Sequence, residues 1–246
     1  MIRKNVRSTT VLNRLRERAS SEKAQVLSGF FKTGEGQYGE GDIFLGVTVP
    51  EIRKISKEFF DLPFPEVSKL LASRYHEARM AGLLILTYAY AKADEDHRTA
   101  IFDFLLSRRV AMNNWDLVDV IAPKTIGVYL TKRKKERKIL YTLAESDNLW
   151  ERRIAIVSTF SFIREGDFAD ALSIAERLLA DRHDLIHKAA GWMLREVGKR
   201  DISVLRTFLD AYASRMPRTM LRYAIERLPE AERKGYLRGG PLTEGL

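Results

Sequence analysis

Trp115 and Asp119 are the two side chains whose types and spacing best suit chemistry. Residues four apart lie on one face of a helix, so this spacing would place an electron-rich indole beside a carboxylate. Two further tryptophans, Trp150 and Trp192, stand near cations in later segments. Aromatic faces, an acid and many cations together indicate a nucleic-acid surface.

Asp119 has two interpretations. It can cap a helix or pair with a cation between helices, which is the commoner fate of an acidic side chain by about three to one. It can instead be a carboxylate exposed on a cationic surface, where it is available for catalysis. Trp115 on the same helix face and Trp192 in a parallel segment favour the second interpretation.

The composition limits the classes of protein to which the chain can belong. A chain of 246 residues with 45% hydrophobic and 30% charged side chains can bury a real core. The formal charge of +9 favours a polyanionic partner such as nucleic acid, although a merely soluble basic protein fits equally well. The absence of cysteine excludes disulfides and thiolate zinc sites. Apolar runs too short for a bilayer and a basic N-terminus indicate a cytoplasmic protein without membrane contact.

Internal repeats organise the chain. A column of related positions falls at 79, 116, 153, 188 and 222, spaced 34 to 37 residues apart; four hold a cation followed two places later by alanine, and Asp116 holds the fifth. A period in this range is typical of paired-helix solenoids. The segments between have helical periodicity, as in Ile202, Leu205 and Phe208, and no strong strand pattern occurs.

These patterns predict an all-α fold, a HEAT-like helical-repeat solenoid over residues 1–246. In such an α-α superhelix the second helix of each pair lines a concave groove, here suited to DNA. Prolines such as Pro50 and Pro123 are expected at helix boundaries or in connections. The first repeat, about 1–60, is less regular because a glycine-rich loop at 34–41 interrupts it. A frayed tail is expected from about residue 237.

Two apparent motifs carry little weight. Glycines 34, 36 and 39 fit the dinucleotide-binding spacing, but the preceding segment has a helical and not a strand pattern. His76-Glu77 begins like a zinc-protease motif, but Met80 stands where the second histidine should be. We therefore expect neither a metal ion nor another cofactor.

Basic side chains are the candidate phosphate contacts. Runs of charge are usually solvated helix faces, but a dense one can also meet a phosphate backbone and release its counterions. Arg153 is the strongest candidate, because Lys188 shares its column and Trp150 lies nearby. The full set is Lys132, Arg133, Lys134, Lys135, Arg152, Arg153 and Lys188.

A groove of this kind offers no deep pocket and therefore suits a reaction whose leaving group is already activated. A cationic alkylated purine in DNA meets that condition, since the charged base departs with little acid assistance. A carboxylate and indole faces can stabilise the oxocarbenium sugar that develops. Asp119 would also hold the attacking water, as carboxylates do in glycoside hydrolysis, and Arg153 would fix the phosphate next to the lesion.

The chain resembles the AlkD-type DNA alkylation-repair glycosylases, which are built from HEAT-like repeats. The resemblance covers nearly the whole chain and rests on four segments in order: 44–53 (FLGVTVPEIR), 114–123 (NWDLVDVIAP), 147–156 (DNLWERRIAI) and 186–196 (IHKAAGWMLRE).

The resemblance implies a monofunctional glycosylase that excises 3-alkyladenine and 7-alkylguanine from duplex DNA and leaves an abasic site. It implies that Asp119 is the catalytic carboxylate, that Trp115 and Trp192 contact the lesion-bearing sugar, and that Arg153 binds phosphate. It also implies activity without turning the base into a pocket. We expect a monomer, because one continuous groove can hold a duplex by itself.

Two departures from the family pattern and one alternative remain. Where the family can place a tyrosine, this chain has Phe30 followed by Phe31, and Tyr38 is the nearest source of a hydroxyl. The loop at 34–41 is also longer than in compact family members.

The alternative function is a non-catalytic HEAT-like scaffold that binds DNA or an acidic protein. Asp119 discriminates between the two, because a carboxylate where phosphates approach weakens DNA binding and is of use only to an enzyme.

Overall fold

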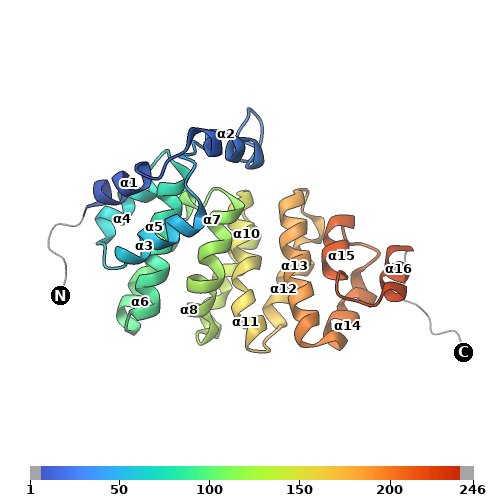
Figure 1. The fold of residues 1–246 in the computed structure, drawn as a ribbon. Coiled ribbons are helices and arrows are strands. Elements are labelled where there is room, and N and C mark those ends of the chain that lie inside the picture. The colour runs from blue at the N-terminus through green and yellow to red at the C-terminus, as the bar shows by residue number, and fades with distance from the viewer. Residues whose placement is uncertain (1–6, 239–246) are drawn as a thin grey trace, which may run out of the picture. The chain divides into compact units, whose positions relative to one another are not determined.

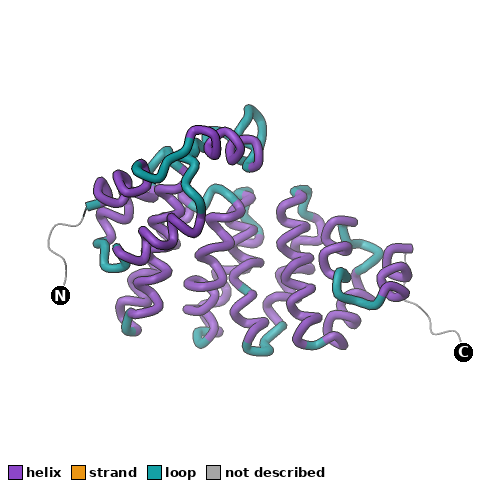
Figure 2. Tube along the Cα trace, in the orientation of Figure 1, coloured by secondary structure: helices purple, strands orange, loops and turns teal. Residues whose placement is uncertain are grey.

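The computed structural model describes residues 7–238, and over this range the chain is helical with short connections (Figures 1 and 2). No strand forms among these residues; a single bridge pairs Ile43 with Tyr75. The all-α helical-repeat class predicted from the sequence is confirmed. Of the predicted tail, residues 237 and 238 belong to the last helix, and the rest lies outside the described residues.

The chain divides into two compact units, residues 1–121 and 122–246. The helices of the first unit are α1 (Ser8–Arg16), α2 (Ser21–Phe30), α3 (Val49–Glu58), α4 (Phe64–Leu71), α5 (His76–Lys92), α6 (Glu95–Ser107), η1 (Arg109–Ala111) and α7 (Trp115–Ile121). Those of the second are η2 (Ala122–Ile126), α8 (Gly127–Thr131), η3 (Lys134–Arg137), α9 (Lys138–Ala144), α10 (Leu149–Ser158), α11 (Phe160–Arg164), α12 (Ala169–Arg177), η4 (Leu178–Ala180), α13 (Asp184–Arg200), α14 (Ile202–Tyr212), α15 (Arg218–Ala224) and α16 (Glu230–Arg238). A single superhelix with a concave groove stays a prediction.

The repeat register read from the sequence is confirmed. The five positions of the column, 79, 116, 153, 188 and 222, fall within the first five residues of α5, α7, α10, α13 and α15 respectively. The predicted start of a helix at Pro50 is also confirmed, because this residue lies in the first turn of α3, where a missing N–H costs nothing. Each repeat therefore presents its column residue near a helix N-terminus.

Helix α5 is the central helix of the first unit, and α1, α3, α4 and α7 all pack against it. Every residue from His76 to Leu86 is buried, which is the pattern of a helix covered on all sides. The burial includes three polar side chains at its N-terminus: His76, Glu77 and Arg79. Because buried polar groups need hydrogen-bond partners, a polar network is expected around the first turn of α5.

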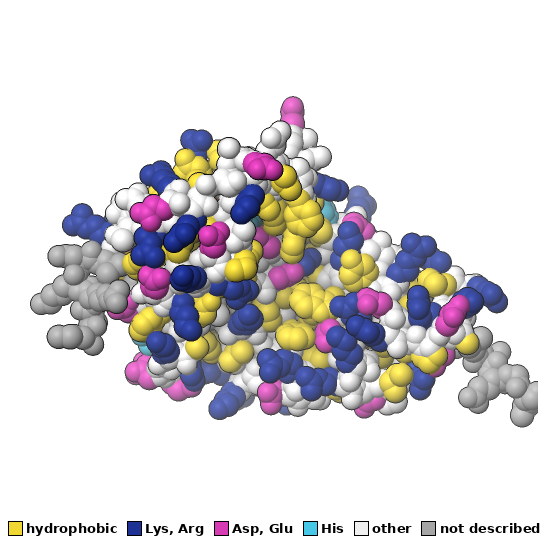
Figure 3. Space-filling view, viewed as in Figure 1, with side chains coloured by type: hydrophobic (Ala, Val, Ile, Leu, Met, Phe, Trp, Pro, Cys, Tyr) yellow, Lys and Arg dark blue, Asp and Glu magenta, His cyan; other side chains and the backbone are white. Residues whose placement is uncertain are grey.

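Helix α2 and the loop after it cover one edge of the first unit. No residue of α2 is buried, and Val26 and Phe30 are 67% and 61% exposed. Figure 3 shows hydrophobic side chains among interspersed charges on the drawn face. Residues 34–41 form a series of turns and bends. Gly39 in this loop is required by sterics, because a Cβ there would lie 2.3 Å from the carbonyl oxygen of Phe31.

Pro123 does not lie in a connection, contrary to the sequence-based expectation. It lies in η2, a five-residue π-helical turn that leads directly into α8. A proline inside a helix lacks an N–H and clashes with the preceding turn, and a wider turn relieves this conflict. The hydroxyl of Ser161 donates a hydrogen bond to the carbonyl oxygen of Pro123.

In the second unit α13 packs against α10, α12, α14 and α15. The approach of α15 depends on Gly191, because a Cβ at this position would lie 2.5 Å from the carbonyl oxygen of Met220. We expect Gly191→Ala to lower the free energy of unfolding by about 2 kcal/mol, the usual cost of overpacking a tight helix contact. Urea denaturation measures this, with Gly29→Ala, where a Cβ meets no atom within 4 Å, as the control.

Candidate functional site

The start of α7 is fixed by Asn114, which is completely buried. Its side-chain oxygen accepts a hydrogen bond of 2.8 Å from the backbone N–H of Trp115, and its amide nitrogen donates to Asp42 Oδ2 at 3.2 Å. Trp115 is thereby the first residue of α7, and Asp119 follows one turn later on the same face. Both side chains are half-buried. The predicted tryptophan–aspartate pair is therefore carried by a short helix with a well-anchored N-terminus.

The indole of Trp115 packs against an aromatic wall. Its ring centroid lies 5.3 Å from that of Phe31 at an interplanar angle of 19°, and 6.1 Å from that of Phe30, which meets it edge to face. Phe31 in turn stacks on Phe44, with ring centroids 5.1 Å apart. Phe30 and Phe31 thus orient Trp115. The hydroxyl of Tyr38 donates to the backbone carbonyl of Phe30 at 3.5 Å.

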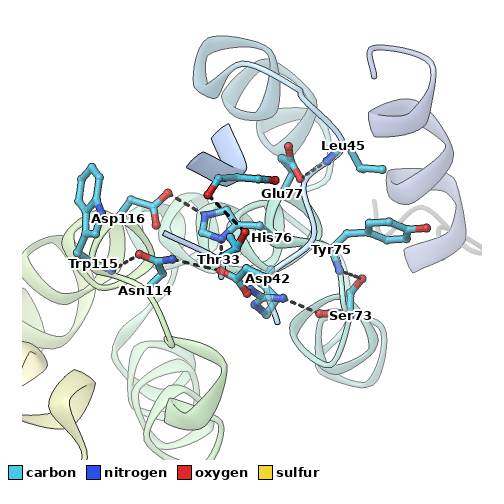
Figure 4. Close-up of polar contacts among 12 residues, drawn as sticks. Thr33, Asp42, Leu45, Ser73, Tyr75, His76, Glu77, Asn114, Trp115 and Asp116 are labelled. Atoms are coloured by element: carbon cyan, nitrogen blue, oxygen red, sulfur yellow. Dashed lines mark hydrogen bonds and ion pairs between the residues drawn. The ribbon is translucent and has the colours of Figure 1, made fainter. Parts of the chain in front are cut away.

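A buried polar network lies behind this wall and is drawn in Figure 4. His76 Nδ1 lies 2.9 Å from Asp42 Oδ2, and its Nε2 lies 2.9 Å from Asp116 Oδ2. Arg79 pairs with the other oxygen of Asp42 and donates to the Ser73 carbonyl at 2.8 Å. The network therefore joins the segment before α3, the first turn of α5 and the first turn of α7.

His76 is an imidazolium in this arrangement. Burial alone lowers the pKa of His76, but the hydrogen bonds that its ring donates to Asp116 and Asp42 outweigh it and raise the pKa to about 9. For Asp42, burial favours the neutral acid, yet His76 and Arg79 hold its pKa below the usual range. His76 and Asp42 are thus both ionised at neutral pH.

The stability of the protein is expected to fall in mild alkali for this reason. The folded-state pKa of His76, about 9, lies above the ordinary value of 6.5, so its contribution is full below pH 6.5 and is lost as the pH rises through 9. The difference corresponds to about 3 kcal/mol. Urea denaturation between pH 6.5 and 10 measures it. His76→Gln should remove most of this pH dependence, whereas His97→Gln, an exposed histidine on α6, should retain it.

Glu77, next to His76, holds the segment before α3. Its carboxylate accepts backbone hydrogen bonds from Leu45 at 2.9 Å, Gly46 at 2.8 Å and Val47 at 3.2 Å. Both residues of the pair His76-Glu77 therefore have structural contacts in the first unit. Among residues 7–238, no group of three His, Asp or Glu side chains could hold a metal ion.

A cavity of about 560 Å³ lies between α2, α3 and α5 in the first unit. Its walls are mostly apolar, with Phe31, Phe44 and Ile52 among them, and His76 and Asp116 supply part of its polar lining. Asp116 Oδ1 is buried without a hydrogen-bond partner among the described residues, whereas Oδ2 is held by His76. The polar network thus borders the cavity.

The predicted phosphate contacts near Trp192 belong to the second unit, and most of them already have partners. Arg152 pairs with Asp181 at 2.6 Å, and Lys188 pairs with Asp184 at 2.7 Å. Arg153 is only 5% exposed and donates to the Leu185 carbonyl at 2.7 Å. Trp192 is half-buried, and its indole nitrogen donates to Glu196 at 3.2 Å. The structure places Trp115 and Asp119 in one unit and this group in the other.

The basic run at 132–138 does not form one uniform surface. Lys132, Lys134 and Lys135 are exposed, although Lys134 also lies 3.4 Å from Asp167. Arg133 lies over the ring of Tyr129 at 4.0 Å. Arg137 is buried and pairs with Asp167 and Asp170, each at 2.8 Å. Lys138 is exposed as well, so the four lysines of the run are its most accessible cations.

Sequence reasoning missed the network around His76. The signals were present: an acid, Asp116, in a column of cations, and a histidine at the start of a largely apolar helix. Their partner, Asp42, lies next to the glycine-rich loop and is separated from His76 by 34 residues. Nothing in the local pattern links the two positions.

Comparison with known proteins gives the class of this protein. A family model described as "DNA alkylation repair enzyme" matches residues 11–228. The chain therefore belongs to this family, and its function lies in DNA alkylation repair. No curated protein matches the chain. Among residues 7–238 no helix is both long and apolar enough to cross a bilayer.

Two solved structures are similar in fold. One is described as a "predicted DNA alkylation repair enzyme from Enterococcus faecalis" and is 16% identical, with a TM-score of 0.68, over 87% of this chain and 98% of that one. The other is smu.31 from Streptococcus mutans, 17% identical with a TM-score of 0.51 over 88% and 95%. At these identities the likeness concerns the fold alone.

Proposed function

We propose that this protein is a monofunctional DNA glycosylase that hydrolyses the N-glycosidic bond of cationic alkylated purines in duplex DNA. The substrates are 3-alkyladenine and 7-alkylguanine, and the product is an abasic site. The observation that carries the proposal is the pairing of Trp115 with Asp119 on one face of α7, a helix whose N-terminus is anchored by buried Asn114. Membership of the DNA alkylation repair family supports it.

The proposed reaction needs little from the protein besides electrostatics. The alkylated base carries a positive charge and leaves with the bonding electrons as a neutral purine, so no general acid is required. The Asp119 carboxylate and the indoles of Trp115 and Trp192 stabilise the positive sugar that forms. Water then adds to the anomeric carbon, and Asp119 takes up its proton.

Phosphate binding is assigned to the cations predicted from the sequence, with an order suggested by their exposure. Lys132 and Lys135 are exposed and can meet a phosphate directly, whereas exposed Lys134 and half-exposed Lys188 do so by giving up Asp167 and Asp184. Arg153 can do so only after its guanidinium leaves the Leu185 carbonyl. Binding through these side chains predicts a steep fall in affinity with salt. We further propose that the protein acts as a monomer in the cytoplasm.

The test is incubation of the purified protein with a duplex that contains one 7-methylguanine, followed by alkaline cleavage of any abasic site. Strand cleavage at the lesion supports a glycosylase. Tight, salt-dependent binding without cleavage would identify a DNA-binding scaffold in its place. Affinity for the duplex that hardly changes with salt would instead indicate that the natural partner is a protein.

A further inference from the structure

We propose that His76 is a positioning residue for this site: its imidazolium bridges two carboxylates and thereby fixes the start of α7, the helix that carries Trp115 and Asp119. This inference rests on the proposed function in so far as it concerns catalysis. His76 does not touch the substrate in the proposed reaction. It acts through Asp116, the neighbour of Trp115.

The geometry requires both ring nitrogens of His76 to donate. Nδ1 and Nε2 each lie 2.9 Å from a carboxylate oxygen, on Asp42 and Asp116 respectively. An ionised carboxylate only accepts hydrogen bonds, and a neutral imidazole has a single N–H. The bridge between the two carboxylates therefore exists only while His76 carries its second proton.

Two chains of contacts link His76 to Trp115 and together form a closed circuit; the hydrogen bond to Asp116 belongs to the polar one. On the polar side, His76 holds Asp116, which is bonded to Trp115 through the backbone. On the aromatic side, the ring of His76 stacks on Phe44 at 4.5 Å, Phe44 on Phe31 at 5.1 Å, and Phe31 on the indole at 5.3 Å. The circuit fixes the indole plane from two directions, so loss of the polar side would free the first turn of α7 to move.

The charges around His76 make it sensitive to a single proton. Asp42 faces it from the segment before α3 and Asp116 from α7, while Arg79 of α5 contacts Asp42. Glu77 of α5 is occupied by three backbone N–H groups. Two further charged side chains, Glu22 and Lys23 of α2, are exposed on the border of the cavity. The residues of α3 that border the cavity are all apolar. When His76 loses its second proton, a single imidazole N–H is left for the two buried carboxylates. The network also loses one positive charge.

The variant Asp116→Asn tests whether His76 positions α7 through its second proton or only supports the structure. An asparagine can donate its amide N–H to Nε2 of a neutral His76, while Nδ1–H still donates to Asp42. In this variant the bridge no longer needs the second proton. Excision by Asp116→Asn should therefore stay within about threefold of wild type at pH 7.5 and lose the alkaline decline that wild type shows.

The activity experiment measures single-turnover excision of 7-methylguanine from pH 7 to pH 10, at saturating protein, with Asp119→Asn as the blank at each pH. One pH unit above the pKa of His76, about one molecule in ten keeps the bridge, so the wild-type rate should fall about tenfold. His97→Gln should follow wild type, and Asp116→Asn should change less than about twofold. A flat wild-type profile to pH 10, or the same decline in Asp116→Asn, would overturn the inference.

A spectroscopic experiment keeps the test independent of the proposed function. In Trp150→Phe/Trp192→Phe the indole of Trp115 is the sole tryptophan, and its near-ultraviolet circular dichroism reports its orientation. We expect a transition with a midpoint near pH 9 that disappears when Asp116→Asn is added. If wild type excises nothing at any pH, the proposed function fails and this readout alone decides the inference; no transition, or one that persists with Asp116→Asn, would refute it.

Discussion

Replacing Asp119 by asparagine is expected to lower the rate of 7-methylguanine excision about 100- to 1,000-fold, the usual cost of removing a charge that stabilises a transition state. The amide can still accept a hydrogen bond from water, but it neither neutralises the developing sugar cation nor takes up a proton. Binding to the duplex should be unchanged or slightly tighter, because a negative charge near the phosphates is removed. Single-turnover excision and fluorescence titration with labelled duplex measure the two effects.

The matched control is Asp103→Asn, which removes the same charge from an exposed position on α6 of the same unit. Its excision rate should match wild type, so a general effect of charge on DNA binding is separated from the role of Asp119. Excision by Asp119→Asn at the rate of the control would remove the assigned role of this carboxylate. A parallel loss of binding and excision would show that Asp119 supports the structure of α7 and not the reaction.

Replacing Glu77 by alanine is expected to be the most destabilising single change in the first unit. The substitution leaves the backbone N–H groups of Leu45, Gly46 and Val47 without their acceptor, and those of Gly46 and Val47 lie in a buried place. Each unsatisfied buried donor costs about 1–3 kcal/mol, so a loss of about 4 kcal/mol in the free energy of unfolding follows. Urea denaturation at pH 7 measures it, before the titration of His76 contributes.

Glu77→Gln is the control for lost packing. Its amide oxygen can replace Oε1, which accepts from Gly46 and Val47, but its NH₂ group meets the N–H of Leu45 where Oε2 accepted. The glutamine variant should therefore lose roughly half as much stability as the alanine variant. Equal losses would mean that the negative charge, and not the hydrogen bonds, holds this segment. Because Phe44 precedes Leu45, either variant should also loosen the stack that supports His76.

The number of cations in a segment does not predict which of them are exposed. Lys132 and Arg137 look alike in the sequence, yet one is exposed and the other is buried between two aspartates. Arg153, chosen for its place in the repeat, is buried as well. A guanidinium can satisfy several acceptors inside a protein, so arginines in a repeat column can hold helices together instead of binding a ligand.

The sequence by itself determined the features that depend on neighbouring residues. Helical periodicity specified the all-α fold, the 34–37-residue period specified the helix that carries each column residue, and a spacing of four specified that Trp115 and Asp119 share a face. Only the tertiary structure decided how α7 is held. His76 meets partners 34 and 40 residues away, and Asn114 meets Asp42 across 72 residues. Such contacts arise from packing between distant helices and loops, and packing also decides which charges are buried and therefore which must be paired.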